Sequence, residues 1–309
     1  MKILLIGIGY LGSELLKFLS NEHQLIALDK MEIAANLKKY CTRTYKGDIL
    51  DESLLDKAIK DCDVVINLSG GGGNISCLKN PLSAVNTYVV GMQKLVRKAE
   101  ERSLRHLILA SSIAVYPFRK DNEFLTEETP PAPKSIYGIL KLCSERVLEE
   151  GSVKNTVFRM ANLYGYTENN PLQPGGALGN FIDACFADKD IIIYGDGSQE
   201  LDYLHISDVC NCIRMQLKTD LNKNYLYNIG SANPLPLLDI AKEVLALGKK
   251  YIFCKNEIKK VPQDTKSESF GRLSITKINN DLQWQPKVDL RAGITEMIEK
   301  YCKISKKSR

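Results

Sequence analysis

The chain has 309 residues, of which 44% are hydrophobic and 26% are charged, so it can bury a large core as one large domain or two unequal ones. Its formal net charge of +5 is the difference between 42 basic and 37 acidic residues, and Lys303, Lys306, Lys307 and Arg309 lie together at the C-terminal end. The body of the chain is therefore close to neutral. Because nucleic-acid binding needs a basic face, we expect no nucleic-acid partner.

The placement of cysteine and histidine argues against disulfides and metal. The nine cysteines form no CxxC motif, and Cys210 and Cys212 have no histidine cluster beside them, which is typical of reduced thiols. His23, His106 and His205 are far apart in the sequence, so we expect no metal site. The first apolar run is too short for a signal peptide, and no run reaches the roughly 18 apolar residues of a membrane span. We expect a cytoplasmic protein that does not bind membranes.

A glycine-rich turn joins the first two predicted elements, a strand over Ile3–Ile6 and an amphipathic helix over Ser13–Leu19. The turn has the spacing GxGxxG. Its first glycine allows the tight turn, the second lets the backbone approach a pyrophosphate, and the third lets helix and strand pack closely. Amides at the start of the helix would donate to the anion. The residues expected to contact a dinucleotide here are Gly7, Gly9, Tyr10, Leu11 and Gly12.

The next predicted strand, Leu25–Leu28, ends at Asp29. A carboxylate at this place can accept hydrogen bonds from both ribose hydroxyls and would repel the 2′-phosphate of NADP, which favours NAD. The residues alone leave two alternatives open. Asp29 is an ordinary turn residue at the end of a strand, or the adjacent Lys30 leaves room for a phosphate.

Strands and helices keep alternating, which indicates a parallel sheet. The next elements are predicted at Thr42–Lys46 (strand), Ser53–Lys60 (helix) and Val64–Leu68 (strand). Between the first two, Asp48 could bond the adenine amino group while Ile49 packs on its ring, and Asp48 could equally cap the following helix. Leu68 stands at a strand end, where open α/β sheets bind ligands. The glycines at 70–73 then form a flexible loop at the place where such a sheet binds ligands, and the two interpretations, a mobile loop and part of the ligand site, are compatible.

The strand predicted at His106–Ala110 follows a long helix over Pro81–Glu101, and it ends in two hydroxyls, Ser111 and Ser112. Such polar side chains at the end of a parallel strand face the ligand crevice. Residues 117–134 contain four prolines and are predicted to be a surface loop.

The helix predicted at Ser135–Glu149 places Tyr137 and Lys141 on one face, because positions i and i+4 of a helix are neighbours. A nearby ammonium lowers the pKa of a phenol from about 10 and can bring it into the range of a general base. Without further motifs the pair is equally consistent with a half-buried tyrosine beside a solvated lysine.

The alternation becomes less regular in the second half of the chain. The predicted elements are a strand at Thr156–Met160, a loop at Ala161–Gly176, a helix at Asn180–Ala187, a turn at Gly195–Gly197, a helix at Asp208–Leu217, a strand at Tyr225–Ile229 and a helix at Leu237–Leu247. We expect an α/β fold with a Rossmann-type, doubly wound parallel sheet in residues 1–170, to which residues 205–230 return. Residues 171–309 are expected to belong mostly to a smaller C-terminal α/β substrate domain.

The chain resembles the extended short-chain dehydrogenase/reductases, in particular their NAD-dependent epimerase/dehydratase branch, over nearly its whole length. Separate motifs carry the resemblance in the family's order. They are Gly7–Gly12, Asp29, Gly47–Ile49, Ser111–Ser112 with Val115–Tyr116, Tyr137–Gly138 with Lys141, Arg159–Gly165, Gly195–Gln199, Asp202–Val209 and Leu282–Val288. The resemblance makes NAD the expected cofactor.

The resemblance implies a catalytic triad of Ser112, Tyr137 and Lys141, with Ser111 as the alternative hydroxyl. Ser112 would bond the reacting oxygen, and Tyr137 would exchange its proton. Lys141 would bind the nicotinamide ribose and lower the pKa of the tyrosine. Asn162 matches the asparagine with which the family contacts its substrates.

Three departures from the family's pattern concern the reaction and the substrate. The glycine turn is one residue shorter than the family's usual GxxGxxG. Ile113 and Ala114 occupy the places of the Asp-Glu pair with which dehydratases of the branch drive elimination, so dehydration is disfavoured. Leu201 stands where sugar-nucleotide enzymes of the branch carry an arginine for the diphosphate, and a second such arginine is missing, Lys266 and Arg272 being the nearest cations.

Three functions therefore stay open from the sequence. The first is an NAD-dependent epimerase of a nucleotide sugar, which oxidises a carbinol and returns the hydride to the other face. The second is an NAD(P)-dependent reductase or dehydrogenase of a sugar or another small polar molecule. The third is an NAD-binding regulator without turnover. The expected partners are a small-molecule substrate and a second copy of the chain in a homodimer. The residues expected to contact the substrate include Leu201 and Arg272.

Overall fold

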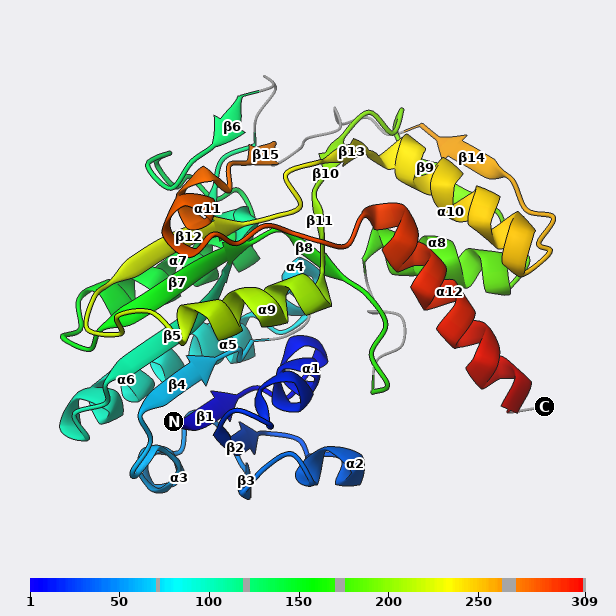
Figure 1. The fold of residues 1–309 in the computed structure, drawn as a ribbon. Helices are drawn as coiled ribbons and strands as arrows, with labels where there is room; N and C mark the ends of the chain where they lie inside the picture. Colours follow the sequence, from blue (N-terminus) through cyan, green and yellow to red (C-terminus); the bar gives the residue numbers. More distant parts are fainter. Residues whose placement is uncertain (71–72, 119–122, 170–175, 263–270, 308–309) are drawn as a thin grey trace.

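A computed structural model of the chain describes residues 1–70, 73–118, 123–169, 176–262 and 271–307, with the side chains described up to residue 303. A seven-stranded sheet dominates it, with strands in the order β12-β7-β5-β4-β1-β2-β3 and every neighbouring pair parallel (Figure 1). Its strands are β1 (Lys2–Ile6), β2 (Gln24–Asp29), β3 (Arg43–Lys46), β4 (Val64–Asn67), β5 (His106–Ser112), β7 (Asn155–Met160) and β12 (Tyr225–Ile229). The expected Rossmann-type parallel sheet is confirmed.

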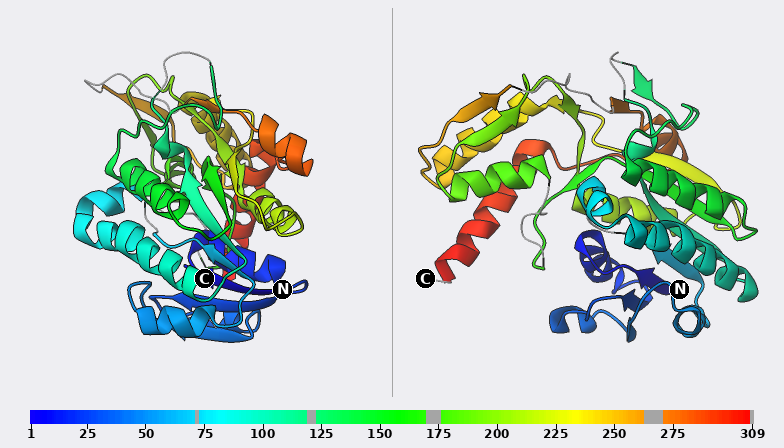
Figure 2. Two further views of the ribbon diagram at one scale, coloured as in Figure 1. Left: turned by 90° about the vertical axis from the view of Figure 1, so that its left-hand side faces the viewer. Right: turned by 180° about the vertical axis from the view of Figure 1, so that it is seen from behind.

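The sheet is apolar on both faces, as parallel sheets covered by helices are. Successive residues of β1 point to opposite faces, so Ile3 and Leu5 join one core cluster while Leu4 and Ile6 join another. The first cluster is completed by α1 (Tyr10–Leu19), α2 (Ala35–Lys38), α9 (Ile206–Gln216) and α11 (Thr276–Leu282). The second is completed by α3 (Glu52–Ile59), α6 (Met92–Glu101) and α7 (Ile136–Glu149), and Figure 2 shows the cyan and green helices α6 and α7 in front of the sheet in its right-hand view.

The direction of the strand order reverses between β1 and β4. In open α/β sheets this reversal opens a crevice at the carboxyl ends of the strands, where ligands bind. The turns after β1, β2, β4 and β5 all reach this edge of the sheet. The positions that the sequence marks as cofactor or catalytic residues are concentrated in these turns.

A smaller lobe lies beside the sheet around a third core cluster (Figure 1). It holds α8 (Ala177–Phe186), α10 (Leu237–Tyr251), α12 (Leu290–Lys307) and the parallel pair β9 (Ile191–Tyr194) and β14 (Ile258–Val261). After residue 170 the chain returns to the sheet with α9 and β12, and again with α11, which packs on β12. Residues 171–309 therefore contain segments that pack with the large sheet as well as the smaller lobe. The division into domains at residues 1–170 and 171–309 stays a prediction.

Several predicted elements differ in detail from the structure. The first helix begins at Tyr10 instead of Ser13, and a short helix, α4 (Gly73–Lys79), begins at the last glycine of the predicted flexible loop, whose residues 71–72 lie outside the described ranges. The helix predicted at Pro81–Glu101 consists of α5 (Pro81–Val85), a π-helical segment η1 (Asn86–Gly91) and α6.

Short strands also occupy two predicted loops. They are β6 (Phe124–Leu125), which pairs with β15 (Arg272–Leu273), and β8 (Asn162–Tyr164), which pairs with β11 (Tyr203–His205). A further short pair joins β10 (Glu200–Leu201) to β13 (Leu235–Pro236). In the described part of the chain, no helix is both long and apolar enough to span a membrane.

Candidate active site

Ser112 and Tyr137 meet at the carboxyl edge of the sheet. Ser112 is the last residue of β5, and its Oγ accepts a hydrogen bond of 3.2 Å from the Ala114 amide, which caps the single 3-10 turn η2 (Ile113–Val115). Ser135 caps α7, its Oγ accepting a 3.1 Å bond from the Gly138 amide, so Tyr137 lies in the first turn of the helix. The side chains of Ser112 and Tyr137 are neighbours here, and their polar interaction lowers the pKa of Tyr137.

Gly138 lets α7 approach close enough for this contact. A Cβ atom at Gly138 would lie 2.0 Å from the Ala114 carbonyl oxygen, a distance that no side chain tolerates. The start of α7 therefore packs directly on the backbone of η2, which follows Ser112. The glycine after the tyrosine is thus a condition for bringing the two hydroxyls together.

Lys141 lies one turn further along α7 and is buried, with 5% of its surface exposed. Its Nζ donates a 2.6 Å hydrogen bond to the Ala110 carbonyl oxygen of β5 and lies 5.8 Å from the centre of the Tyr137 ring. Burial lowers the pKa of Lys141 to about 8, and the Glu145 carboxylate acts in the opposite direction. With this pKa, the Lys141 ammonium begins to lose its proton just above neutral pH.

The expected lowering of the tyrosine pKa by Lys141 is not seen. Burial raises the pKa of Tyr137 to about 12, and the polar interaction with Ser112 opposes this only in part. The physical reason is that the Lys141 ammonium donates to the Ala110 carbonyl oxygen, while the half-buried phenol loses part of its contact with water. A lowered pKa therefore stays a prediction for the protein with its cofactor bound.

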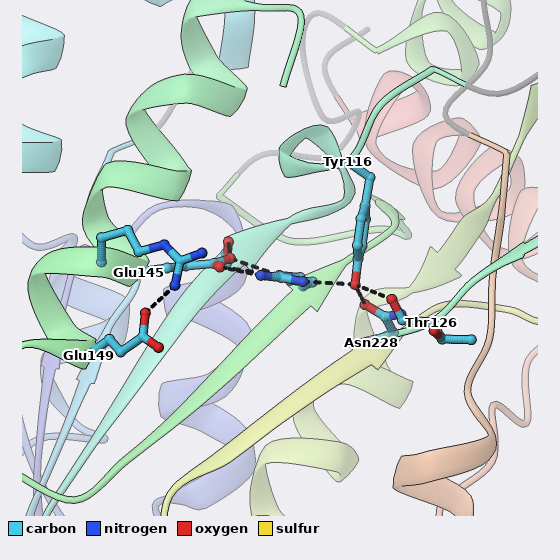
Figure 3. Close-up of polar contacts among 8 residues, drawn as sticks. Tyr116, Thr126, Glu145, Glu149 and Asn228 are labelled. Carbon is cyan, nitrogen blue, oxygen red and sulfur yellow. Dashed lines mark hydrogen bonds and ion pairs between the residues drawn. The ribbon is translucent and has the colours of Figure 1, made fainter. Parts of the chain in front are cut away.

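Ser111, the alternative hydroxyl, is engaged elsewhere. It is buried, and its Oγ donates to Glu145, whose carboxylate forms a buried ion pair with Arg159 at 2.7 Å. Arg159 in turn donates a 3.0 Å bond to the Tyr116 hydroxyl. Figure 3 labels Glu145 and Tyr116, the two residues that Arg159 connects. This geometry favours Ser112 over Ser111 as the residue that faces a substrate.

The glycine turn has the geometry of a phosphate-binding loop. Gly7 has φ +92°, and a Cβ there would lie 2.9 Å from the Leu68 backbone, while a Cβ at Gly12 would lie 2.2 Å from the Gly7 carbonyl oxygen. Both positions therefore require glycine. A Cβ at Gly9 would meet nothing within 4 Å, so the space in front of this exposed residue is open for a ligand. The first helical residues, Tyr10 and Leu11, lie at the N-terminus of α1, where backbone amides have no partner within the helix.

Asp29 connects this turn to an adjacent cavity. Its carboxylate accepts a 2.5 Å bond from the Ile8 amide and a 2.7 Å bond from the Met31 amide. Beside it lies a cavity of about 240 Å³, lined by Ile8, Asp29, Met31, Glu32, Ile33, Ala34, Leu37 and Asn169. Two carboxylates, from Asp29 and Glu32, face this space, so its chemistry fits uncharged ribose hydroxyls better than a phosphate.

Lys30 and Asp48 form an ion pair of 3.0 Å. This pairing gives the Lys30 ammonium a partner other than a phosphate. Asp48 also accepts a 3.1 Å bond from the Leu50 amide. The alternative that Asp48 caps the following helix is wrong, because Asp51 caps α3 by accepting from the Leu54 amide at 3.0 Å.

Ile49 is buried in the second core cluster, and Leu68 lies against the backbone of the glycine turn. Ile49 is 4% exposed and packs beside Gly91 of η1. Their contact with adenine or nicotinamide stays a proposal. Among the described residues, no group of His, Cys, Asp and Glu side chains has a geometry that could hold a metal ion.

The expected substrate contacts lie on three short strands outside the seven-stranded sheet, β8, β10 and β15. Asn162 is exposed, with its Nδ2 donating a 3.1 Å bond to the Asp202 carbonyl oxygen. Leu201 packs against the core of the smaller lobe. Arg272 is engaged by Glu200 in a two-pronged ion pair, with bonds of 2.9 and 2.7 Å. Lys266 lies outside the described residues.

The model of the NAD dependent epimerase/dehydratase family matches residues 3–230 of this chain. The chain belongs to this family. The resemblance drawn from the sequence motifs is therefore confirmed, and so is NAD, by which the family is defined.

Similar family members include enzymes of two kinds. The UDP-glucose 4-epimerase of Lactobacillus helveticus is 27% identical over 81% of this chain and 84% of its own length. The dTDP-glucose 4,6-dehydratase of Streptomyces niveus is 25% identical over 97% of this chain and 93% of its own length. The crystal structure of the UDP-glucose 4-epimerase from Thermotoga maritima with UDP-glucose superposes with a TM-score of 0.86, at 24% identity, over 99% of this chain and 100% of that one. It shares the fold.

Proposed function

We propose that the chain is an NAD-dependent epimerase that acts on a nucleotide sugar through Ser112, Tyr137 and Lys141. The observation that carries this proposal is the meeting of Ser112, at the end of β5, with Tyr137, in the first turn of α7, while Lys141 is buried one turn away with its Nζ 5.8 Å from the centre of the Tyr137 ring. Relatives in the family support the substrate class, because they include UDP-glucose and dTDP-glucose enzymes.

Each of the three side chains has a role that its position supports. When bound, NAD supplies the acceptor and donor of the hydride. Ser112 donates to the reacting sugar oxygen and fixes its orientation. Tyr137 takes the proton from that oxygen and later returns it. Lys141 binds the nicotinamide ribose with its ammonium.

The proposed cofactor site is the crevice edge formed by the turns after β1 to β4. The glycine turn holds the pyrophosphate, Asp29 holds the adenine ribose, and the remaining contacts come from neighbouring turns. The proposed residues are Gly7, Gly9, Tyr10, Leu11, Gly12, Asp29, Asp48, Ile49 and Leu68, together with Tyr137 and Lys141. Asn162 is the proposed substrate-contacting asparagine.

A preference for NAD over NADP is expected from Asp29. Its carboxylate and that of Glu32 border the cavity where a 2′-phosphate would lie, and like charges brought together there repel. Asp29→Asn should weaken NADH binding, because it removes the carboxylate that accepts hydrogen bonds from the ribose. It should also narrow the difference in affinity between NADH and NADPH, because it removes one negative charge that repels the 2′-phosphate. Fluorescence titration with NADH and NADPH measures both effects. Equal or tighter binding of NADPH to the unchanged protein would refute the assignment.

Dehydration has no proton-transfer groups at the expected place. Ile113 and Ala114, which follow Ser112, are apolar and only 4% and 5% exposed. An elimination needs an acid and a base beside the sugar carbon that loses water. The side chains of η2 supply neither, which supports epimerisation over dehydration.

Glu200 and Arg272 support a second candidate, an NAD(P)-dependent reductase or dehydrogenase of a sugar or other small polar molecule. A diphosphate in a sheltered cleft needs cationic partners, since unpaired charge there costs several kcal/mol. Arg272 is engaged by Glu200, and Leu201 offers only apolar surface. A substrate without a diphosphate would leave this pair undisturbed.

The two candidates differ in their use of the cofactor. An epimerase should purify with tightly held NAD and convert UDP-glucose or dTDP-glucose into an epimer, detected by NMR, without net change in NADH absorbance. A reductase should consume NADH in step with its substrate. Net consumption of NADH, with no epimer formed, would replace the first proposal by the second.

Binding of UDP and dTDP tests whether Arg272 serves as a relocated diphosphate clamp. We expect micromolar binding that Arg272→Ala weakens about 10- to 100-fold, the range of a lost charged hydrogen bond. Glu200→Gln should tighten binding, because it removes the carboxylate that competes for the guanidinium. Arg146→Ala, an exposed arginine on α7, is the matched control and should change nothing. Isothermal titration calorimetry measures all four proteins, and no binding at millimolar nucleotide would end the nucleotide-sugar proposal.

Self-association as a homodimer is supported by an apolar surface on helices that pack together, α4, α5 and α7. Its large exposed side chains are Ile75, Leu78, Leu82, Val85 and Ile139, of which Leu82 is 74% exposed. Contiguous apolar surface of this kind marks interaction sites. Light scattering measures the mass in solution, and a monomer at micromolar concentration would contradict this proposal.

A further inference from the structure

Tyr88 packs against both Tyr137 and Lys141, although it belongs to a different helix. The rings of Tyr88 and Tyr137 meet edge to face, with their centres 6.1 Å apart. The Lys141 Nζ lies 5.0 Å from the centre of the Tyr88 ring, closer than the 5.8 Å to the centre of the Tyr137 ring. Only 5% of Tyr88 is exposed. The Tyr88 ring is therefore a wall of the candidate active site.

The backbone around Tyr88 is unusual in a way that fits this position. Tyr88 lies in the π-helical segment η1, and single π turns inside α-helices occur frequently at functional sites. Its carbonyl oxygen accepts a 2.7 Å hydrogen bond from the Ser144 hydroxyl of α7. The segment η1 is thus tied to the helix that carries Tyr137 and Lys141.

The Tyr88 hydroxyl is held from the opposite side by the loop after β4, where it donates to the Gly70 carbonyl oxygen. Burial raises the pKa of Tyr88, and so does the neighbouring Tyr137, so the hydroxyl keeps its proton and remains a donor. Gly70 has φ +96°, and a Cβ there would lie 2.3 Å from the Tyr88 ring. Any residue but glycine at position 70 would push the ring out of its place.

We propose that Tyr88 is a positioning residue that holds the Lys141 ammonium and the Tyr137 ring in their working arrangement. This inference rests on the proposed roles of Tyr137 and Lys141. The face of an aromatic ring attracts a cation, most strongly where both are shielded from water, and Lys141 is buried. The edge-to-face contact limits the tilt of the Tyr137 ring as well.

The charge of Lys141 depends on every group that faces it. These groups are Tyr137 and Glu145 on α7, Tyr88 on η1 and Cys77 on α4. Burial lowers the pKa of Lys141 to about 8, while Glu145 and Cys77 raise it. Attraction to the Tyr88 ring favours the charged form of Lys141, so the ring raises this pKa as Glu145 and Cys77 do. Removal of the ring should therefore let the lysine lose its proton at a lower pH.

Titration of NADH binding against pH tests this role without any substrate. The affinity should fall as pH rises through the pKa of Lys141, because the ammonium contacts the ribose. In Tyr88→Leu the midpoint of this fall should move down by about one pH unit, which corresponds to about 1.4 kcal/mol. In Tyr88→Phe the midpoint should stay, because phenylalanine keeps the ring.

Tyr227→Leu is the matched control. It removes an equally buried tyrosine, stacked on Phe158 with ring centres 6.2 Å apart, without touching Lys141. It should lower the unfolding temperature and leave the midpoint unchanged. If Tyr88→Leu does not fold, Gly70→Ala, which displaces the same ring, should shift the midpoint in the same direction.

An unchanged midpoint in a folded Tyr88→Leu or Gly70→Ala protein would overturn the inference, as would an equal shift in Tyr227→Leu. The proposed function fails in a different way. A wild-type protein that binds NADH but converts no nucleotide sugar would refute the epimerase and leave the test of Tyr88 intact.

Discussion

Replacement of Tyr137 by phenylalanine is expected to lower turnover about 10²- to 10⁴-fold, the usual contribution of a positioned acid–base group. The affinity for NADH should change little, because the variant loses one oxygen and its ring keeps its contact with Tyr88. Lys141→Ala should lower both quantities, since it removes the ribose contact and the buried charge together. Steady-state rates and fluorescence titrations with NADH measure the two effects separately.

The pH dependence of the wild-type rate should also reflect proton transfer by Tyr137. Burial raises the pKa of Tyr137 to about 12, so the phenol holds its proton at neutral pH. The form that accepts a proton becomes more abundant as pH rises, and sugar oxidation should accelerate with it. If Lys141 lowers this pKa once the cofactor is bound, the increase levels off at a lower pH. In Tyr137→Phe the increase should be absent.

Tyr227→Phe is the control for the lost hydroxyl. The Tyr227 hydroxyl donates a 2.9 Å hydrogen bond to Asp281. Among the described residues, it forms no hydrogen bond with Ser112 or Lys141. Its removal should leave turnover unchanged. A Tyr137→Phe protein that keeps more than a few per cent of the activity would exclude Tyr137 as the proton-transfer group.

The sheet could be predicted from the sequence because its strands are signalled locally. Ile3–Ile6 is an apolar run that ends at a glycine turn, and Tyr225–Ile229 is rich in aromatic and aliphatic residues that favour strands, and both form strands of the parallel sheet. The short strands could not be predicted in this way. The two residues of β15 become a strand only because β6, far away in the chain, lies beside them. The π-helical segment η1 was missed because nothing in its composition separates it from an ordinary helix.

The candidate site divides along the same line. Ser112, Tyr137 and Lys141 were predicted from family spacing, and the structure brings their side chains into one place. Tyr88 was missed because its contacts depend on how η1 packs on α7, which no local pattern reveals. The partner of Arg272 was missed for a similar reason, since Glu200 reaches it from the other lobe. The contacts of Tyr88 and the ion pair of Arg272 both join residues that are far apart in the sequence, so local propensity does not predict them.

Removal of one partner of the buried ion pair between Glu145 and Arg159 is expected to lower the free energy of unfolding by about 3–5 kcal/mol. The two side chains are only 8% and 5% exposed, and Arg159 bonds the carboxylate through Nε at 3.1 Å and through Nη2 at 2.7 Å. Glu145→Ala would leave the guanidinium in the protein interior without its anion. It would also free the Ser111 hydroxyl, whose acceptor is the same carboxylate.

The loss should spread through a polar network that crosses the sheet (Figure 3). Arg159 donates to the Tyr116 hydroxyl, which lies 2.8 Å from the Asn228 Oδ1 and 2.9 Å from the Thr126 carbonyl oxygen. This network joins β7 to β12 and to the turn after β6, and Arg159 pairs in register with Ser111, the residue before Ser112 in β5. Glu145→Ala should therefore lower turnover as well, because the end of β5 loses its support.

Arg146 and Glu149 provide the matched control on the same helix. Figure 3 labels the carboxylate of each pair, Glu145 and Glu149. They form an Arg–Glu ion pair like the first, but their side chains are 60% and 63% exposed. An exposed pair contributes at most about 1 kcal/mol, so Arg146→Ala should change stability little. Urea unfolding followed by circular dichroism measures both variants. If Glu145→Ala and Arg146→Ala lowered the free energy of unfolding equally, burial would not determine how much an ion pair stabilises this protein. The predicted role of the Glu145–Arg159 network would then be wrong.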